Sequence, residues 1–326
     1  MKKLVVLLAS AVLLLIVSAC SQTEEEQNQK VSIMLDWYPN AVHSFLYVAQ
    51  EKGYFEEEGI EVDIQFPANP SDPINLAAAS KVTLGITYQP DVLIAKTEQG
   101  IGIKSVGTLV RSPLNHVAFL QSSGIASPKD LEGKTVGFTG IPLNEAMLET
   151  MMETDGADYS KVEMVDVGFE LTSSLVSEKT DAVIGAYINH EVPLLEHEGF
   201  PTGHIDPTEY GVPSFYELVV VTSDDTWEKE HENIRAFWRA AGKAFADMEN
   251  DPDEALSTLL KHQDEANFPL VEEVEKESLS ILLPKMKAPN AFGEQDAETW
   301  KVTAEWMLET GLLTKEPDLD GIFVEM

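Results

Sequence analysis

Short apolar runs alternate with amphipathic segments along most of the chain, and the alternation occurs in two successive rounds. The first round contains the runs "KVSIMLDW", "IEVDIQFPA", "KVTLGITY" and "IKSVGTLV", and the second contains "HVAFLQ", "KTVGF", "KVEMVDVG" and "DAVIGAYI". Apolar runs of this length, separated by helix-like segments, are typical of the β-α-β units of an open α/β sheet. One such segment, "FLYVAQEKGYFEEEG", predicts a single helix that ends near Gly59. The sequence therefore predicts two α/β units.

A further apolar run and a long helical pattern follow these two rounds. The run "YELVVVTS" predicts a returning strand, and from His231 onward the pattern is almost wholly helical. About 300 residues are too many for one small core. We predict two α/β lobes, the first formed by residues 31–114 and 218–326 and the second by residues 115–217. Two crossovers, near 112–116 and 214–219, would join them, and a helical C-terminal tail would dock on the first lobe.

The N-terminus predicts export. "MKK" is followed by the apolar stretch "LVVLLASAVLLLIV" and by "VSAC", which together indicate a signal peptide over residues 1–19. The apolar stretch is shorter than the ~20 residues of a membrane span. "VSAC" resembles a lipobox, which implies cleavage before Cys20 and a diacylglycerol on its thiol; the alternative is an ordinary signal peptide with a chance cysteine. Residues 20–30 would form a polar tether, and the protein would be extracytoplasmic and held at the cell membrane by lipid.

The charge of the chain limits its partners. The formal net charge is −34, and removal of the two signal-peptide lysines would make it −36. Phosphates of nucleic acids and anionic lipids should be repelled, so neither is expected as a partner. Arginine, which commonly binds phosphate or sulfonate, is limited to Arg111, Arg235 and Arg239. A ligand is therefore expected to be neutral or cationic.

Signatures of catalysis and of metal binding are missing from the sequence. His190 and His197 flank Glu191 at a spacing of seven residues, which does not match the "HExxH" pattern of zinc sites. "GIGIKSVG" lacks the spacing of a dinucleotide- or phosphate-binding loop, and there is no "GxSxG" motif. We therefore predict a protein that is not an enzyme and has no cofactor or metal.

Two stretches carry a resemblance to a known family. "LDWYPNAVHSFLYVAQEKGYFEEEGIEVDI" and "ASPKDLEGKTVGF" resemble the pyrimidine-binding, thiamine-synthesis-like family of ABC-transporter solute-binding lipoproteins, over about residues 30–313. The resemblance implies a bilobed type II periplasmic-binding-protein fold, here a monomer, that captures a pyrimidine thiamin precursor such as formylaminopyrimidine and passes it to a membrane permease. The alternatives are another small solute, such as a sulfonate or a flavin fragment, or a pyrimidine-synthase-like enzyme. Such synthases use a cysteine-rich motif that this chain lacks.

Ligands of open α/β sheets lie beyond the carboxyl ends of the strands, and aromatic residues stand at two such ends. Trp37 follows the first predicted strand and Tyr187 ends the strand "DAVIGAY", so they would stack on the two faces of a pyrimidine ring. The alternative for both is a place in the core, and Tyr38 is open between the two roles. Glu191, in the first turn of "NHEVPLLEH" with Asn189 as N-cap, would accept hydrogen bonds from an amino group on the ring.

Further polar residues stand in the same predicted loops. Each is either a ligand contact or a local brace or helix cap: Asn40, His43, Gln89, Asp91, Asn144 and Glu145. For His43 the second possibility is a hydrogen bond that braces the first corner from inside the lobe. For Asn144 it is a helix cap. The sequence does not decide between these roles.

Overall fold

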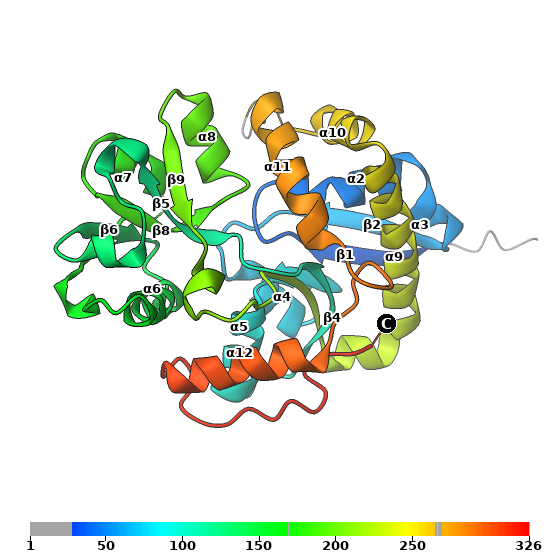
Figure 1. Ribbon diagram of the computed structural model, residues 1–326. Coiled ribbons are helices and arrows are strands. Elements are labelled where there is room, and N and C mark those ends of the chain that lie inside the picture. Colours follow the sequence, from blue (N-terminus) through cyan, green and yellow to red (C-terminus); the bar gives the residue numbers. More distant parts are fainter. Residues whose placement is uncertain (1–27, 169, 265, 267–268, 326) are drawn as a thin grey trace, which may run out of the picture.

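The computed structural model describes residues 28–168, 170–264, 266 and 269–325, and contains two five-stranded sheets (Figure 1). The predicted signal peptide, Cys20 and most of the predicted tether lie outside the described residues. Each sheet is covered by helices on both faces, as the two rounds of alternation predicted. We call the part of the chain around the first sheet the first lobe, and the part around the other sheet the second lobe.

The first sheet has the strand order β2-β1-β3-β10-β4. Its strands are β1 Gln29–Met34, β2 Ile60–Gln65, β3 Leu84–Thr87, β4 Ile103–Val110 and β10 Leu218–Ser223. β1 runs parallel to β2 and β3, whereas β10 runs antiparallel to both of its neighbours. The returning strand therefore enters the middle of the sheet, between β3 and β4.

The second sheet has the order β7-β6-β8-β5-β9. Its strands are β5 Asn115–Leu120, β6 Thr135–Phe138, β7 Glu163–Asp166, β8 Ala182–Tyr187 and β9 Thr202–Ile205. β6 is parallel to β7 and β8, and β5 is antiparallel to β8 and β9. The edge strand β9 was not predicted, because "TGHI" is only four residues long and contains a glycine and a histidine.

The helices cover the faces of the sheets and form the tail. Those of the first lobe and the tail are α2 Ser44–Glu51, α3 Tyr54–Glu57, α4 Asp72–Ala78, α5 Gln89–Thr97, α9 Asp224–Asn250, α10 Pro252–Lys261, α11 Glu272–Met286 and α12 Ala297–Glu309. Those of the second lobe are α6 Pro142–Thr154, α7 Leu171–Val176 and α8 Glu191–His197. Short 3-10 turns include η1 Ala41–His43, η3 Pro128–Leu131 and η5 Pro207–Tyr210. Within the described residues, no helix is both long and apolar enough to span a bilayer.

Three predicted boundaries are corrected by the structure. The amphipathic segment after η1 is not one helix, because Gly53 adopts φ +73° and separates α2 from α3. The long helix α9 begins at Asp224 rather than near His231, with the Ser223 side chain accepting a hydrogen bond from the Thr226 N–H as N-cap. β1 begins at Gln29, inside the segment predicted as tether.

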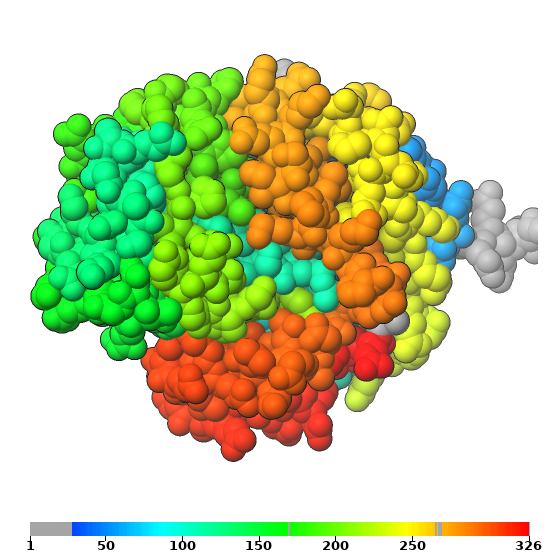
Figure 2. Space-filling view, viewed as in Figure 1, coloured from blue at the N-terminus to red at the C-terminus, as the bar shows by residue number. Residues whose placement is uncertain are grey.

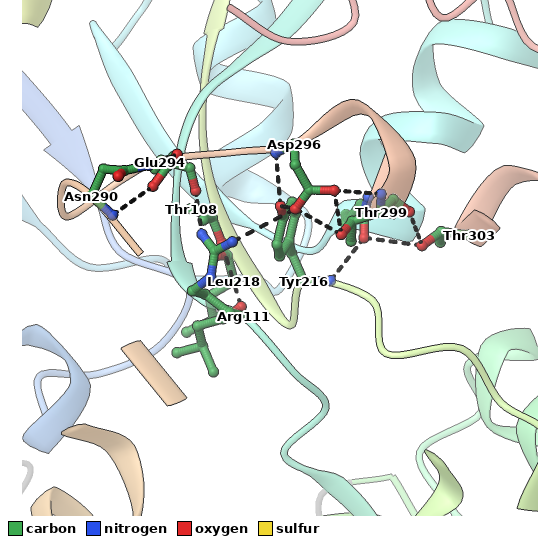
Figure 3. A network of polar contacts seen from close by, with 11 residues as sticks. Thr108, Arg111, Tyr216, Leu218, Asn290, Glu294, Asp296, Thr299 and Thr303 are labelled. Atoms are coloured by element: carbon green, nitrogen blue, oxygen red, sulfur yellow. Dashed lines mark hydrogen bonds and ion pairs between the residues drawn. The ribbon is translucent and has the colours of Figure 1, made fainter. Parts of the chain in front are cut away.

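The chain passes between the sheets twice, from β4 to β5 and from β9 to β10, and both passages are held by the tail. The Tyr216 hydroxyl donates to Asp296 Oδ2 over 2.6 Å, and the Arg111 guanidinium lies 5.2 Å from the centre of the Tyr216 ring (Figure 3). Asp296 also accepts from the Thr299 N–H as the N-cap of α12. The two crossovers are thus anchored at the start of α12.

Tail helices also contact the second lobe. Trp306 Nε1 on α12 donates to Thr150 Oγ1 on α6 over 3.1 Å, and Asn189 Nδ2 beside α8 donates to Ser278 Oγ on α11 over 3.0 Å. On the face shown in Figure 2, the green surface of the second lobe meets the orange surfaces of α11 and α12. The tail therefore packs on the first lobe and bridges to the second.

Candidate functional site

Aromatic and acidic side chains gather where strands of both lobes end. Asp36 and Trp37 follow β1, Tyr88 follows β3, Tyr187 ends β8, and Glu217 stands directly before β10. β1 and β3 are neighbours in the first sheet, whereas β8 belongs to the second. These residues therefore come from both lobes. Two strand ends belong to the first lobe, one belongs to the second, and Glu217 belongs to a crossover.

Tyr187 connects these parts. Its hydroxyl donates to Glu217 Oε1 over 3.0 Å, and Tyr88 lies near enough to contribute to the rise in its pKa. Burial raises the pKa of Tyr187 well above its ordinary value, and the negative charge of Glu217 acts in the same direction. Burial also raises the pKa of Tyr88, with the nearby charge of Asp36 as the next cause. Side chains from both lobes thus meet at Tyr187.

Tyr88, Asp91 and Tyr187 are partly exposed side chains at a strand end or at the start of the helix that follows it. Each of the three keeps part of its surface accessible to solvent. Protein atoms nevertheless surround them closely enough that burial raises the pKa of Asp91 to about 6 and raises those of both tyrosines. The three side chains therefore stand at the border between the protein interior and solvent, where burial disfavours their charged forms.

Glu217 is almost completely buried, at 3% exposure. Its Oε2 accepts the Leu114 N–H over 2.7 Å and the Asn115 N–H over 3.3 Å. Burial raises the pKa of Glu217, while these backbone hydrogen bonds act in the opposite direction. The carboxylate of one crossover therefore binds the backbone of the other.

The corner after β1 is braced from within the first lobe. His43 is completely buried; its Nδ1 accepts the Asn40 N–H over 3.2 Å, and its Nε2 lies 2.8 Å from Asp36 Oδ1. Because Nδ1 is the acceptor, Nε2 carries the proton and donates to Asp36. The Asn40 side chain accepts the Val42 N–H as the N-cap of η1. Both nitrogens of His43 are used inside the lobe, which is the bracing role that the sequence left open.

Trp37 is not a core residue. Its exposure of 37% is among the highest of the large hydrophobic side chains, and its ring meets the edge of the Tyr38 ring at 5.8 Å between centres. Tyr38 in turn lies 5.9 Å from Phe66, which is also exposed. An exposed tryptophan at a strand end suits a stacking surface, and its contact with ligand remains a prediction.

Glu191 lies in the first turn of α8, half-buried, as predicted, but its surroundings differ from the prediction. Its Oε2 accepts the Tyr187 N–H over 2.7 Å, so the carboxylate holds the backbone of Tyr187. The N-cap of α8 is His190 rather than Asn189, because the Asn189 side chain is buried and donates to Ser278 on α11.

Asn144 is buried, and its side chain is bonded within the second lobe. Its Nδ2 donates to Thr139 Oγ1 and its Oδ1 accepts from Asn115 Nδ2, both over 2.9 Å. Asn115 Oδ1 accepts the Gly185 N–H over 2.8 Å. Gly185 has φ +105°, and a Cβ there would lie 2.9 Å from Asn144 Nδ2, so the close approach requires glycine. The N-cap of α6 is Ile141, so Asn144 is not the cap, and Glu145 lies half-buried in the same first turn.

Gln89 is completely buried at the start of α5 and contacts the second crossover. Its Oε1 accepts the Tyr216 N–H over 2.8 Å and lies 3.3 Å from Thr303 Oγ1 on α12. The structure therefore brings Gln89 to the crossover and α12. It brings Asp91, two residues later, near Tyr88, whose pKa the charge of Asp91 helps to raise.

Three residues of the site were not singled out from the sequence: Asp36, Tyr88 and Glu217. Asp36 is next to Trp37 and Tyr88 is next to Gln89, so the position after a strand that singled out those two residues also applied to Asp36 and Tyr88. Glu217 had no such signal, since its partners at Leu114 and Tyr187 are distant in sequence.

The site is acidic and lacks nearby basic partners. In the described part of the chain, the carboxylates of Asp91, Glu191 and Glu217 form no ion pair with lysine or arginine. Nor do three or more histidine, cysteine, aspartate and glutamate residues converge into a possible metal site among the described residues. A ligand that donates hydrogen bonds or carries positive charge suits this environment.

Comparisons with known proteins agree with this architecture. The chain is 54% identical over 286 residues to the formylaminopyrimidine-binding protein of Halalkalibacterium halodurans, covering 87% of this chain and 86% of that protein. It is 30% identical over 252 residues to the 4-amino-5-hydroxymethyl-2-methylpyrimidine phosphate synthase of Uromyces fabae, covering 74% and 73% of the two chains.

A solved structure with the same architecture is the periplasmic aliphatic sulphonate binding protein SsuA of Escherichia coli. It has a TM-score of 0.71 and 14% identity, over 90% of this chain and 96% of that one. The predicted bilobed periplasmic-binding-protein fold is thereby confirmed. The family model described as "NMT1/THI5 like" matches residues 40–255. The chain belongs to the NMT1/THI5-like family.

Proposed function

We propose that this protein is the extracytoplasmic solute-binding component of an ABC importer, and that it captures a small amino-pyrimidine, formylaminopyrimidine or a close thiamin precursor. The observation that carries the proposal is the meeting of Tyr88, Tyr187 and Glu217, which come from the first lobe, the second lobe and a crossover. The 54% identity to a formylaminopyrimidine-binding protein supports the choice of ligand.

The chemistry of the site supports a flat ligand with amino groups. Trp37 and Tyr187 offer aromatic faces, which stack on a heterocycle with roughly 1–3 kcal/mol per ring. Carboxylates accept hydrogen bonds from ring amino groups. Glu191 follows Tyr187 by four residues, and Asp91 lies near Tyr88. A sulfonate, the runner-up ligand, would meet this acidic surface without a nearby arginine to neutralise it.

Closure of the lobes would complete the site. Because Trp37 belongs to the first lobe and Tyr187 to the second, a ligand would contact both rings only when the lobes approach each other. Such a ligand favours the closed form by its differential affinity for the two arrangements. We propose a membrane permease as the recipient of the ligand, a lipid on Cys20 as the membrane anchor, and a monomer as the working form.

The test is a ligand screen on the protein expressed from its full-length gene and extracted in mild detergent. Formylaminopyrimidine, thiamin, riboflavin and taurine would be compared by the shift in unfolding temperature. At a ligand concentration 100 times its Kd, the stabilisation should be about 2.7 kcal/mol. A shift with formylaminopyrimidine and none with taurine is the expected result. A shift with taurine alone would overturn the proposal.

We also propose that the ligand is bound without chemical change, although synthases occur among the relatives. Incubation of formylaminopyrimidine with a stoichiometric amount of protein, followed by mass spectrometry of the released ligand, should return it unaltered. Recovery of a modified pyrimidine would contradict binding as the sole activity and favour the synthase alternative.

A further inference from the structure

Two consecutive residues of the second crossover make opposite connections. Tyr216 points to the tail, where its hydroxyl donates to Asp296 over 2.6 Å (Figure 3). Glu217 points to the second lobe, where it accepts the Tyr187 hydroxyl over 3.0 Å. Each of the two thus forms a tyrosine–carboxylate hydrogen bond, on opposite sides of one crossover.

Tyr187 is held at both of its ends by carboxylates. Its backbone N–H donates to Glu191 over 2.7 Å, and its hydroxyl donates to Glu217 over 3.0 Å. Hydrogen bonds to ionised acceptors are shorter and stronger than neutral ones. With both ends fixed, the aromatic ring has little freedom to rotate.

Glu217 also joins the two crossovers directly. Its second oxygen accepts the N–H groups of Leu114 and Asn115, and the Asn115 side chain continues the connection to Gly185 in β8. Leu114 and Asn115 are buried, so their N–H groups have no access to water as a substitute acceptor. The same carboxylate therefore sets the spacing of the crossovers and the orientation of the Tyr187 ring.

We propose that Glu217 is a positioning residue for ligand binding, fixing the ring of Tyr187 to the paired crossovers so that the ring faces the ligand in one orientation. This inference rests on the proposed function, in which Tyr187 stacks on the pyrimidine. Glu217 itself acts through Tyr187 and needs no contact with the ligand. The affinity then depends on a residue of the crossover as well as on the residues that contact the ligand.

The experiment is a double-mutant cycle in the full-length protein, measured as the Kd for formylaminopyrimidine by calorimetric titration. Tyr187→Phe keeps the ring and removes the hydroxyl, and should weaken binding about tenfold, as expected for loss of a charged hydrogen bond. Glu217→Ala should weaken binding at least as much. Because both changes break one interaction, the double variant should be no more than about threefold weaker than Glu217→Ala alone.

Two further variants separate positioning from general stability. In Glu217→Gln the amide oxygen can still accept both backbone N–H groups while its NH₂ donates to the Tyr187 oxygen, so affinity should stay within about threefold of wild type. Tyr216→Phe removes the matched hydroxyl on the other side of the crossover. It should lower the unfolding temperature but leave the Kd within about twofold of wild type. The Tyr216 hydroxyl binds Asp296, and its loss leaves the hydrogen bond between Glu217 and Tyr187 in place.

The outcomes distinguish this inference from the proposed function. If the wild-type protein binds no pyrimidine, the proposed function fails and this inference fails with it. If the wild type binds and Tyr187→Phe binds within twofold of it, the positioning role alone is overturned. The positioning role is also overturned if the losses of affinity in Tyr187→Phe and Glu217→Ala add fully in the double variant. Should Glu217→Ala not fold, Tyr187→Phe and Glu217→Gln still decide, since the role requires a loss in the first and rescue in the second.

Discussion

The buried histidine beside the first crossover should make stability depend on pH. His116 lies in β5 at 2% exposure, with Nδ1 3.1 Å from His204 Nδ1 and Nε2 3.9 Å from Asp206 Oδ2. Burial lowers the pKa of His116 to about 4. The charge of Asp206 opposes this lowering, whereas the charges of His204 and of Lys285 on α11 add to it.

The sign of the effect follows from proton uptake. In the unfolded chain the imidazole has an ordinary pKa near 6.5, so below that pH the unfolded state binds a proton that the folded state excludes. The contribution of His116 to the free energy of unfolding is therefore complete above pH 6.5 and is lost as the pH falls toward 4. A pKa lowered to about 4 corresponds to roughly 3 kcal/mol, at about 1.4 kcal/mol per pH unit.

The assay compares urea unfolding of the wild type and His116→Gln at pH 7.5 and pH 4.5. Other titrating groups contribute to both proteins and cancel in the difference. We expect the stability of the wild type, relative to the variant, to be roughly 2–3 kcal/mol greater at pH 7.5 than at pH 4.5. His197→Gln, at an exposed position on α8, is the matched control and should show no such change. An equal difference between wild type and His116→Gln at both pH values would refute the reasoning.

Three other predictions concern the site and the anchor. Trp37→Ala should weaken pyrimidine binding by roughly 1–3 kcal/mol with little loss of stability, since Trp37 is 37% exposed; titration and thermal unfolding of the same variant check both parts. Glu191→Gln should cost roughly 1.5–3 kcal/mol of binding energy by calorimetry, while an amide oxygen still accepts the Tyr187 N–H; wild-type affinity would remove Glu191 from the pocket. Cys20→Ala should release the protein from the membrane fraction, or leave it unprocessed, without a change in affinity, and an unacylated Cys20 in membrane-derived protein would contradict anchoring.

The fold could be predicted largely from local patterns. Nine of the strand segments are apolar runs bounded by turn residues, and burial of such runs on both faces of a sheet is what makes them recognisable. The strand β9 was not predicted, because it has only four residues and pairs only with β5 at the edge of the sheet. The break between α2 and α3 escaped because a glycine in an amphipathic segment is compatible with a continuing helix as well as with the left-handed turn that Gly53 adopts.

The site was predictable only in part. Position at a strand end was enough to single out Trp37 and Tyr187, because this signal is local. The role of Glu217 depends on contacts with Leu114 and Tyr187, which only the assembled fold brings near it. Whether a polar side chain faces a ligand or the protein is likewise a tertiary property. Gln89 and Asn144 stand in the first turns of helices that follow strands, as expected, yet their amides are bonded to the crossover and to Asn115.

The place of β10 in the first sheet has a consequence for how the chain folds as it emerges from a membrane. All strands of the second sheet come from one uninterrupted stretch, residues 115–205, so that sheet can assemble as soon as this stretch has been translocated. The first sheet has to wait for Leu218–Ser223, because without β10 the facing edges of β3 and β4 remain unpaired. The first lobe, although its strands are the earliest in the chain, would therefore complete its sheet after the second lobe.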